Sequence, residues 1–230
     1  MQKQKVAFFD IDGTIFRWSL FIEYTEMMIE DGVFPKNAKE EYKKEYDAWL
    51  NREGSYEDYI SALIRVFDKY IAGVNVSDFK DIAQRAVQKR AKRVYRFTRD
   101  LISELKAQDY FLVAISHSAK MAVDMFAQNY DFDKVYGVMF EFEDEHFTGK
   151  ILNKELIFDK GKIVERFFEK EADSLTRKGS IAVGDTHGDI AMLEKVERPI
   201  AFNPNKALFD EAQKRGWEVV VERKDVIYNI

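Results

Sequence analysis

The sequence contains no cysteine, and this absence excludes several kinds of chemistry. Without a thiol the chain has no disulfide, no thiolate nucleophile and no thiolate zinc site. Any metal site built from its carboxylates would present hard oxygen ligands. The lack of disulfides also fits the reducing environment of the cytoplasm.

A strong excess of positive charge is missing as well. The 230 residues include 36 Lys and Arg against 41 Asp and Glu, which gives a formal net charge of −5. A weakly negative balance creates no field that would attract a nucleic-acid backbone. The densest basic stretch, Lys89 to Arg93, is more typical of a solvated helix face. We therefore expect no nucleic-acid partner.

Long hydrophobic runs are also lacking. Only four apolar residues, Val6 to Phe9, precede Asp10, which is too short for the core of a signal peptide. No later run approaches the length of a membrane span. Hydrophobic residues nevertheless make up 46% of the chain, enough to bury a sizeable core. We expect a cytoplasmic protein with no membrane span.

Short apolar runs alternate with helical periodicities over most of the chain. Runs that predict strands lie at residues 6–9, 111–115, 181–183, 199–202 and 217–221, and residues 136–151 resemble a hairpin. Residues near 101–105, 121–126 and 163–168 have the spacing of helices. Strands separated by helices predict an α/β fold with a doubly wound, mostly parallel, Rossmann-like sheet.

The stretch from residue 16 to residue 91 has a different character. Apolar residues recur there at helical spacing, and no segment has a convincing strand pattern. We therefore expect a small all-helical cap domain at 16–91, inserted after the first strand. Residues 1–15 and 92–230 would form the catalytic α/β core.

Three predicted strands end in polar clusters, at residues 10–14, 116–118 and 184–189. In an open α/β sheet, ligands bind beyond the carboxyl ends of the strands. Folding would crowd four carboxylates there, and two unit charges about 4 Å apart repel by about 4 kcal/mol at an effective dielectric near 20. A divalent cation would relieve this repulsion, and Mg²⁺ suits an all-oxygen site.

The same residues can carry out phosphoryl transfer. Asp10 and Asp12 are two residues apart, so one carboxylate can attack phosphorus while the other donates a proton to the leaving oxygen. Ser116 and Lys160 can hold the phosphoryl oxygens. Taken singly, these residues have simpler interpretations, such as a polar turn, a helix N-cap or a solvated lysine. The order of the three polar clusters, each directly after a predicted strand, favours the catalytic interpretation.

The four motifs together resemble those of the haloacid dehalogenase superfamily of phosphohydrolases, in the branch that includes phosphoserine phosphatase. Residues 9–14 are similar to the first motif, Ser116 to the second, Lys160 to the third and residues 184–189 to the fourth. The helical stretch lies where that branch carries its cap, so the resemblance covers nearly the whole chain.

The resemblance implies a role for each motif residue. Asp10 would be the nucleophile and Asp12 the general acid and base. The Asp10 and Asp185 carboxylates and the Asp12 backbone carbonyl would ligate Mg²⁺, and Asp189 would orient these ligands or bind through water. The implied function is Mg²⁺-dependent hydrolysis of a small organic phosphate monoester through an aspartyl-phosphate on Asp10. A phosphotransferase or phosphomutase using the same intermediate is the alternative, and a catalytically inactive phosphate-binding module is a third possibility.

The residues around the substrate depart from the family pattern. Where phosphoserine phosphatases carry an acidic residue and an arginine in the cap, this chain has Ser19 and, by an ungapped count, Ser61. Nearness to the motifs makes five other residues candidates for substrate contact: Thr14, Phe16, Trp18, His117 and His187. The competing interpretation is that the aromatic residues pack helices and the histidines only fill loop positions.

Overall fold

The fully buried run Val6 to Phe9 forms most of β1 (Gln4–Phe9), which lies in the middle of an eight-stranded sheet. The computed structural model, which describes residues 3–90 and 92–230, gives the strand order β4-β3-β2-β1-β5-β6-β7-β8. Continuous apolar runs are typical of parallel strands covered on both faces. β1 accordingly pairs in parallel with a neighbour on each side, β2 and β5.

The sheet is mostly parallel, as the sequence predicted. Parallel pairs join β2 to β3, β5 to β6 and β6 to β7, whereas β4 and β8 pair with their neighbours in antiparallel fashion at the two edges. The remaining strands are β2 (Phe111–Ala119), β3 (Lys134–Glu143), β4 (His146–Leu152), β5 (Leu175–Gly184), β6 (Arg198–Phe202), β7 (Glu218–Arg223) and β8 (Val226–Asn229).

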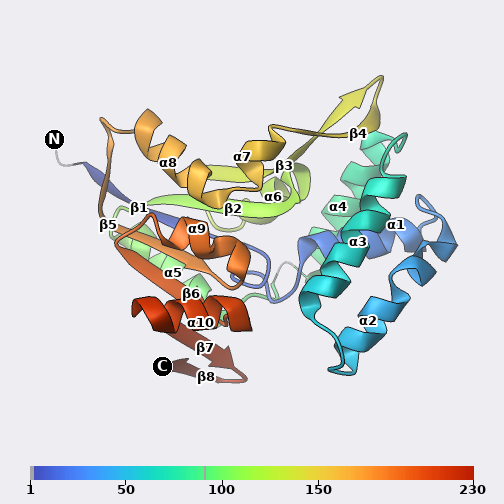
Figure 1. Ribbon diagram of the computed structural model, residues 1–230. Coiled ribbons are helices and arrows are strands. Elements are labelled where there is room, and N and C mark those ends of the chain that lie inside the picture. The colour runs from blue at the N-terminus through green and yellow to red at the C-terminus, as the bar shows by residue number, and fades with distance from the viewer. Residues whose placement is uncertain (1–2, 91) are drawn as a thin grey trace. The chain divides into compact units, whose positions relative to one another are not determined.

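Helices cover both faces of the parallel strands. Right-handed crossovers place helices on one face where the strand order runs from β1 to β3 and on the other where it runs from β5 to β7. Figure 1 shows this arrangement, with α8, α9 and α10 in front of the sheet and α5 and α6 behind it. The bounds are α5 (Arg96–Ala107), α6 (Lys120–Ala127), α7 (Lys154–Ile157), α8 (Lys160–Lys170), η2 (His187–Asp189), α9 (Ile190–Leu193) and α10 (Lys206–Arg215).

The register of the strands determines where the polar motifs meet. Phe9, the last residue of β1, pairs with Ala114 of β2 and with Val183 of β5. Asp10 therefore leaves the sheet at the same edge as the end of β2 and as Asp185, which follows β5. The geometry of parallel pairing, and no special contact, brings the three clusters together.

The chain divides into two compact units. The core unit comprises Met1–Ser19, Ala91–Val138 and Asn153–Ile230, and the cap unit comprises Leu20–Arg90 and Met139–Leu152. The predicted division placed residues 16–19 in the cap and residues 139–152 in the core, so it differs from these bounds. The predicted end of the cap at Ala91 lies outside the described residues.

The cap unit contains five helices among its described residues, together with the hairpin of residues 139–152, which the last part of β3 forms with β4. The helices are α1 (Leu20–Glu30), η1 (Lys36–Glu41), α2 (Lys43–Leu50), α3 (Tyr56–Tyr70) and α4 (Val76–Arg90). Ser55 begins α3 with a capping box, because its hydroxyl accepts from the Asp58 backbone N–H and Asp58 accepts from Ser55. An isolated bridge joins Asn75 to His146, so the hairpin is tied to the helices.

Aromatic side chains form the hydrophobic centre of the cap unit. The Phe67 ring lies 5.5 Å from that of Phe140 and 5.8 Å from those of Tyr24 and Phe34. Phe79 lies 5.4 Å from Phe147, which brings the hairpin into the same cluster. Edge-to-face and tilted pairs at these distances are favourable beyond the area that they bury.

Two short features of the fold differ from the sequence prediction. β5 begins six residues before the predicted start at Ile181, and β8 was not predicted at all.

Of the helices that the structure describes, none is long and apolar enough to cross a bilayer.

Phe67→Ala should lower the free energy of unfolding of the cap unit by about 3–5 kcal/mol, because it removes a buried ring and leaves a cavity. Denaturant unfolding followed by circular dichroism measures the effect. Phe142→Ala is the matched control, because Phe142 is 54% exposed in the same unit, and its change should stay within about 0.5 kcal/mol. Equal losses in the two variants would contradict the assignment of Phe67 to the cap centre.

Candidate active site

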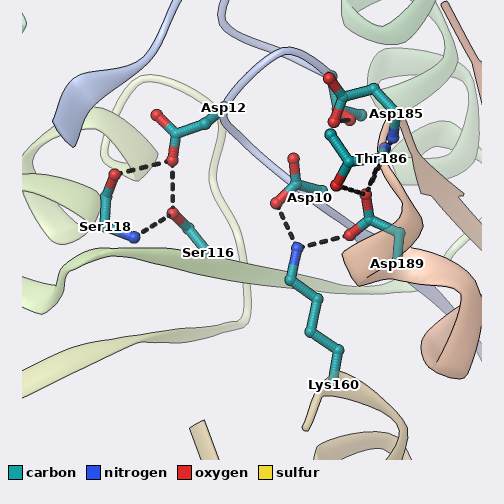
Figure 2. Close-up of polar contacts among 9 residues, drawn as sticks. Asp10, Asp12, Ser116, Ser118, Lys160, Asp185, Thr186 and Asp189 are labelled. Carbon is teal, nitrogen blue, oxygen red and sulfur yellow. Dashed lines mark hydrogen bonds and ion pairs between the residues drawn. The ribbon is translucent and has the colours of Figure 1, made fainter. Parts of the chain in front are cut away.

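A buried ion triad lies at the carboxyl edge of the sheet. The Lys160 ammonium nitrogen lies 2.5 Å from Asp10 Oδ1 and 2.6 Å from Asp189 Oδ1, and all three side chains are almost fully buried (Figure 2). Lys160 is the first residue of α8, whose N-terminus is capped by Asp159 through the Lys162 backbone N–H. The capped helix start therefore positions the ammonium group of this cluster.

Asp189 holds the loop that follows β5. One of its oxygens bonds Lys160, while Oδ2 accepts hydrogen bonds from the backbone N–H groups of Asp185 and Thr186, each at 3.0 Å. A Cβ at Gly184 would lie 2.4 Å from Asp189, so only glycine lets strand and loop approach this closely. Asp189 thereby links the third and fourth motifs.

Asp185 is held from the opposite side by the first motif. The Thr14 hydroxyl donates to Asp185 Oδ1 at 3.4 Å. Gly13 adopts φ +83°, and a Cβ there would lie 2.0 Å from Asp185 Oδ2. Both the left-handed backbone and the missing side chain make glycine necessary at this position.

Asp12 belongs to a second network, beside the ion triad. Its Oδ2 accepts hydrogen bonds from the hydroxyls of Ser116 at 2.7 Å and Ser118 at 2.8 Å, as Figure 2 shows. The Ser118 backbone N–H in turn donates to Ser116 Oγ at 2.9 Å. The end of β2 thus fixes the orientation of the Asp12 carboxylate.

Charge is unevenly balanced among the buried carboxylates. Burial raises the pKa of Asp10 to about 7, against the opposing effect of the Lys160 ammonium. Burial and then the Asp10 carboxylate raise the pKa of Asp185 well above its ordinary value. Burial would also raise the pKa of Asp189, but Lys160 outweighs it and lowers that pKa. Asp189 is therefore the ionised partner of Lys160, and the one ammonium group is too little positive charge to keep Asp10 and Asp185 ionised as well.

The donor set fits a hard divalent cation. Asp10, Asp185 and Asp189 each offer a carboxylate oxygen, and these atoms lie within 4.8 Å of one another. A dication would supply the charge that Asp10 and Asp185 lack, and oxygen ligands are those that Mg²⁺ prefers.

The structure brings together six of the predicted residues: Asp10, Asp12, Ser116, Lys160, Asp185 and Asp189. Thr14, predicted to contact substrate, is fully buried and bonds Asp185. Phe16 is also fully buried, with its ring 5.6 Å from that of Phe126, so no part of it is exposed to a substrate. Both side chains are therefore packed inside the protein and cannot contact a substrate.

The other candidates for substrate contact lie at or near the surface. Trp18 is half-buried, and its carbonyl accepts from the Gly13 backbone N–H, so it closes the turn of the first motif. His117 and His187 are exposed residues. Desolvation, followed by the Lys160 ammonium, lowers the pKa of His117 to about 4, so its ring is neutral at pH 7 although part of the side chain is exposed.

Ser118 lies beside Asp12, although the sequence predicted a role only for Ser116 in the polar cluster 116–118. It is 1% exposed and contacts the same carboxylate oxygen as Ser116. The available signal was its spacing, because residues i and i+2 of a strand face the same side. Thr98 was also missed; its hydroxyl donates to the Thr14 carbonyl at 2.9 Å and anchors the first motif to α5.

Two known proteins are similar in sequence to most of this chain. The phosphoserine phosphatase of Methanocaldococcus jannaschii is 25% identical over 228 residues, spanning 98% of this chain and 95% of that protein. The inhibition of morphological differentiation protein of Streptomyces azureus is 26% identical over 224 residues, spanning 93% of this chain and 77% of that protein.

Solved structures show the same fold. A protein of unknown function from Bordetella pertussis superposes with a TM-score of 0.70 at 20% identity, covering 95% of this chain and 98% of that chain. A phospho-aspartyl intermediate analogue of phosphoserine phosphatase superposes with a TM-score of 0.63 at 21% identity, covering 97% and 96%.

The family comparison covers all four motifs, because the match to haloacid dehalogenase-like hydrolases runs over residues 7–194. It confirms the family, the fold class and the hydrolase class that the sequence predicted. The chain belongs to the haloacid dehalogenase-like hydrolase family.

Proposed function

We propose that the protein is a Mg²⁺-dependent phosphatase that hydrolyses a small organic phosphate monoester through an aspartyl-phosphate on Asp10. One observation carries the proposal. The Asp10 carboxylate, at the end of the central strand, contacts a buried lysine and shares its cluster with two further carboxylates, while serine hydroxyls orient Asp12 nearby. This arrangement supplies a nucleophile, a proton donor and positive charge for phosphoryl transfer.

In the first step a carboxylate oxygen of Asp10 bonds phosphorus and the bond from phosphorus to the ester oxygen breaks. The leaving oxygen takes a proton from Asp12 and departs as an alcohol. Both serine hydroxyls donate to Asp12 Oδ2, so we assign the transferred proton to Asp12 Oδ1. Leaving-group protonation of this kind contributes about 10²–10⁴-fold in typical enzymes.

In the second step Asp12 accepts a proton from water, and the water oxygen bonds phosphorus. The bond between phosphorus and Asp10 breaks, which releases inorganic phosphate and restores the carboxylate. Lys160 stays beside Asp10 in both steps and balances negative charge there. In the proposed mechanism the Ser116 hydroxyl donates to a phosphoryl oxygen of the bound substrate in place of Asp12, while Ser118 keeps the Asp12 carboxylate oriented.

The metal would be held by the carboxylates of Asp10 and Asp185 and by the Asp12 backbone carbonyl. When bound, Mg²⁺ supplies positive charge for the phosphoryl oxygens and lowers the repulsion between Asp10 and an anionic substrate. Asp189 would keep Asp185 in place through the backbone hydrogen bond described above.

The test of the proposed function is release of inorganic phosphate from a panel of amino-alcohol, sugar, nucleotide, aryl and lipid-derived phosphates with Mg²⁺. The panel includes phosphoserine, although this chain has Ser19 and Ser61 at the positions where the resemblance places the charged residues that bind phosphoserine. Absence of turnover across the whole panel would contradict the proposal.

Asp10→Asn should reduce phosphate release to the limit of detection, because an amide of equal size cannot form the acyl-phosphate. Circular dichroism should show an unchanged fold. Asp173→Asn, at an exposed aspartate of the core unit, is the matched control and should keep full activity. Substantial activity in the Asp10 variant would overturn the nucleophile assignment.

Ser118→Ala should lower kcat by about 10-fold or more, because a hydrogen bond to a charged group is worth about 1.5–3 kcal/mol. KM should change less, since Ser118 acts through Asp12. Ser103→Ala removes an exposed hydroxyl that donates to the Arg99 carbonyl, and serves as the control for steady-state kinetics. The role fails if both variants have the same kcat.

Mg²⁺ should raise the Tm more at about pH 8 than at about pH 6, because a metal must displace the proton that Asp10 holds below pH about 7.

The raised pKa of Asp10 also affects the stability of the protein without metal. In the unfolded chain Asp10 loses its proton near pH 3.8, whereas in the folded protein it keeps the proton up to about pH 7. The contribution of Asp10 to the free energy of unfolding of the metal-free protein therefore decreases as the pH rises from about 4 to about 7. Differential scanning calorimetry with and without chelator measures both effects, and a larger Mg²⁺ shift at the lower pH would contradict the assignment.

A further inference from the structure

The basic stretch Lys89 to Arg93, expected to form a solvated helix face, is divided in the structure. α4 ends at Arg90, and both Lys89 and Arg90 form ion pairs with Glu23, at 4.0 Å and 2.7 Å. Arg93 lies beyond the helix, in a segment of the core unit that pairs with the turn of the first motif. The surroundings of Arg93 are therefore those of the candidate active site and not those of a helix face.

Two short segments of the core unit pair beside the first motif. An antiparallel bridge joins Phe16 to Val94, and the Arg17 backbone N–H donates to the Arg93 carbonyl at 2.9 Å. Residues opposite each other in an antiparallel pair lie on the same face, and successive residues alternate between the faces. Arg17 and Arg93 therefore lie opposite each other, on the face that Phe16 and Val94 do not share.

Like charges directly opposite each other destabilise a pair of strands. Arg17 and Arg93 are both exposed, and neither guanidinium forms an ion pair with a carboxylate of residues 3–90 or 92–230. We call these two residues the arginine pair. An anion that binds between the two guanidinium groups supplies the opposite charge and removes their mutual repulsion.

The Arg17 side chain has a defined position. Its guanidinium lies over the Tyr95 ring, 5.5 Å from the ring centroid. The Tyr95 ring in turn lies edge-to-face against that of Phe202, at 4.9 Å, and the Tyr95 backbone N–H donates to the Ile15 carbonyl at 3.0 Å. A guanidinium that is already stacked on a fixed ring loses less freedom when it binds a carboxylate or a phosphate.

The turn that carries Arg17 is part of the candidate active site. The Gly13 backbone N–H donates to the carbonyls of Phe16 and Trp18, on either side of Arg17, at 2.9 Å and 3.0 Å. The same glycine lies against the metal cluster, because a Cβ there would lie 2.0 Å from Asp185 Oδ2. The turn thus joins Arg17 directly to the residues of the first motif.

The carboxylates around this turn have other partners. Asp185 belongs to the metal cluster, and Asp12 accepts hydrogen bonds from the serine hydroxyls of β2. Glu222 accepts hydrogen bonds from the backbone N–H groups of Arg96 and Phe97, at 3.1 Å and 2.8 Å. The Arg96 guanidinium adds further positive charge and donates to a backbone carbonyl. The charge balance on this side of the site therefore favours an anion from outside the chain.

We propose that the arginine pair selects substrates that carry a second anionic group, a carboxylate or a phosphate, on the leaving alcohol. This inference rests on the proposed function, in which the phosphoryl group is transferred to Asp10 and the leaving oxygen is protonated by Asp12. Arg17 lies in the same turn as Asp12, so an anion on the leaving alcohol can reach the arginine pair. Guanidinium groups bind a carboxylate or a phosphate through two parallel N–H donors each.

The test is isothermal titration of the full chain, with Mg²⁺ and at constant ionic strength, with phosphonates in which a carboxylate replaces a methyl group. 3-Phosphonopropionate is compared with propylphosphonate, and 4-phosphonobutyrate with butylphosphonate. In at least one of these pairs the carboxylated ligand should bind at least about tenfold more tightly, because it adds charge-assisted hydrogen bonds. Equal binding within both pairs, or no binding of any of the four ligands, would overturn the proposal.

Phosphonates are not hydrolysed, so this result does not depend on turnover. Tighter binding of the carboxylated ligands without turnover of any phosphate ester would contradict the proposed function and leave the anion selectivity standing. Turnover of phosphate esters with equal binding of the paired phosphonates would contradict only the role of the arginine pair.

Variants locate the contact. Arg17→Gln and Arg93→Gln should each remove most of the preference for the carboxylated ligand, while the binding of propylphosphonate stays the same. Arg166→Gln, at an exposed arginine of α8 in the core unit, is the matched control and should keep the preference. An unchanged preference in both active-site variants, or an equal weakening of the paired phosphonates, would contradict a direct contact with the carboxylate.

The Tm without ligand separates this role from a structural one. Arg93→Gln should leave the Tm constant or raise it, because the change removes repulsion from the arginine opposite. Differential scanning calorimetry measures the shift. A lower Tm together with an unchanged ligand preference would assign Arg93 to packing and would sink the proposal.

Discussion

One ammonium group shared between two buried carboxylates is the interaction on which the site depends. Lys160 neutralises Asp189, and Asp189 then uses its second oxygen to hold the backbone that presents Asp185. Removal of the lysine would leave the Asp10 and Asp189 charges buried without a counter-charge, which is strongly unfavourable. The same lysine is too little charge for three carboxylates, and this shortage is what makes the cluster suited to a dication.

Asp12, the residue that we propose transfers the proton, is held by hydrogen bonds of its own outside that cluster. Asp12 is oriented by hydroxyls from β2, whereas Asp10 is oriented by a cation from α8. Environments that differ in this way give neighbouring carboxylates different roles. Asp10 and Asp12 are two residues apart in the sequence, but the elements that hold them, α8 and β2, are more than 40 residues apart.

The sequence predicted the fold class and the family. It also predicted that Asp10, Ser116 and Asp185 meet at one edge of the sheet, because parallel strands paired in register end at the same edge. It could not predict contacts that depend on side-chain packing. Phe16 and Thr14 looked like substrate contacts from their nearness to Asp12, but the turn of the first motif directs both inward. β8 was missed because its short, mostly exposed strand carries little hydrophobic pattern.

The hairpin of β3 and β4 has a practical consequence for dissecting the molecule. Because residues 139–152 belong to the cap unit, the chain passes between the units four times, at residues 19–20, 90–91, 138–139 and 152–153. Deletion of residues 20–90 alone would remove Phe67 and Phe79, whose rings pack against Phe140 and Phe147, and would expose the hairpin rings to water. A soluble capless enzyme would therefore require a second deletion, with a short turn in place of the hairpin.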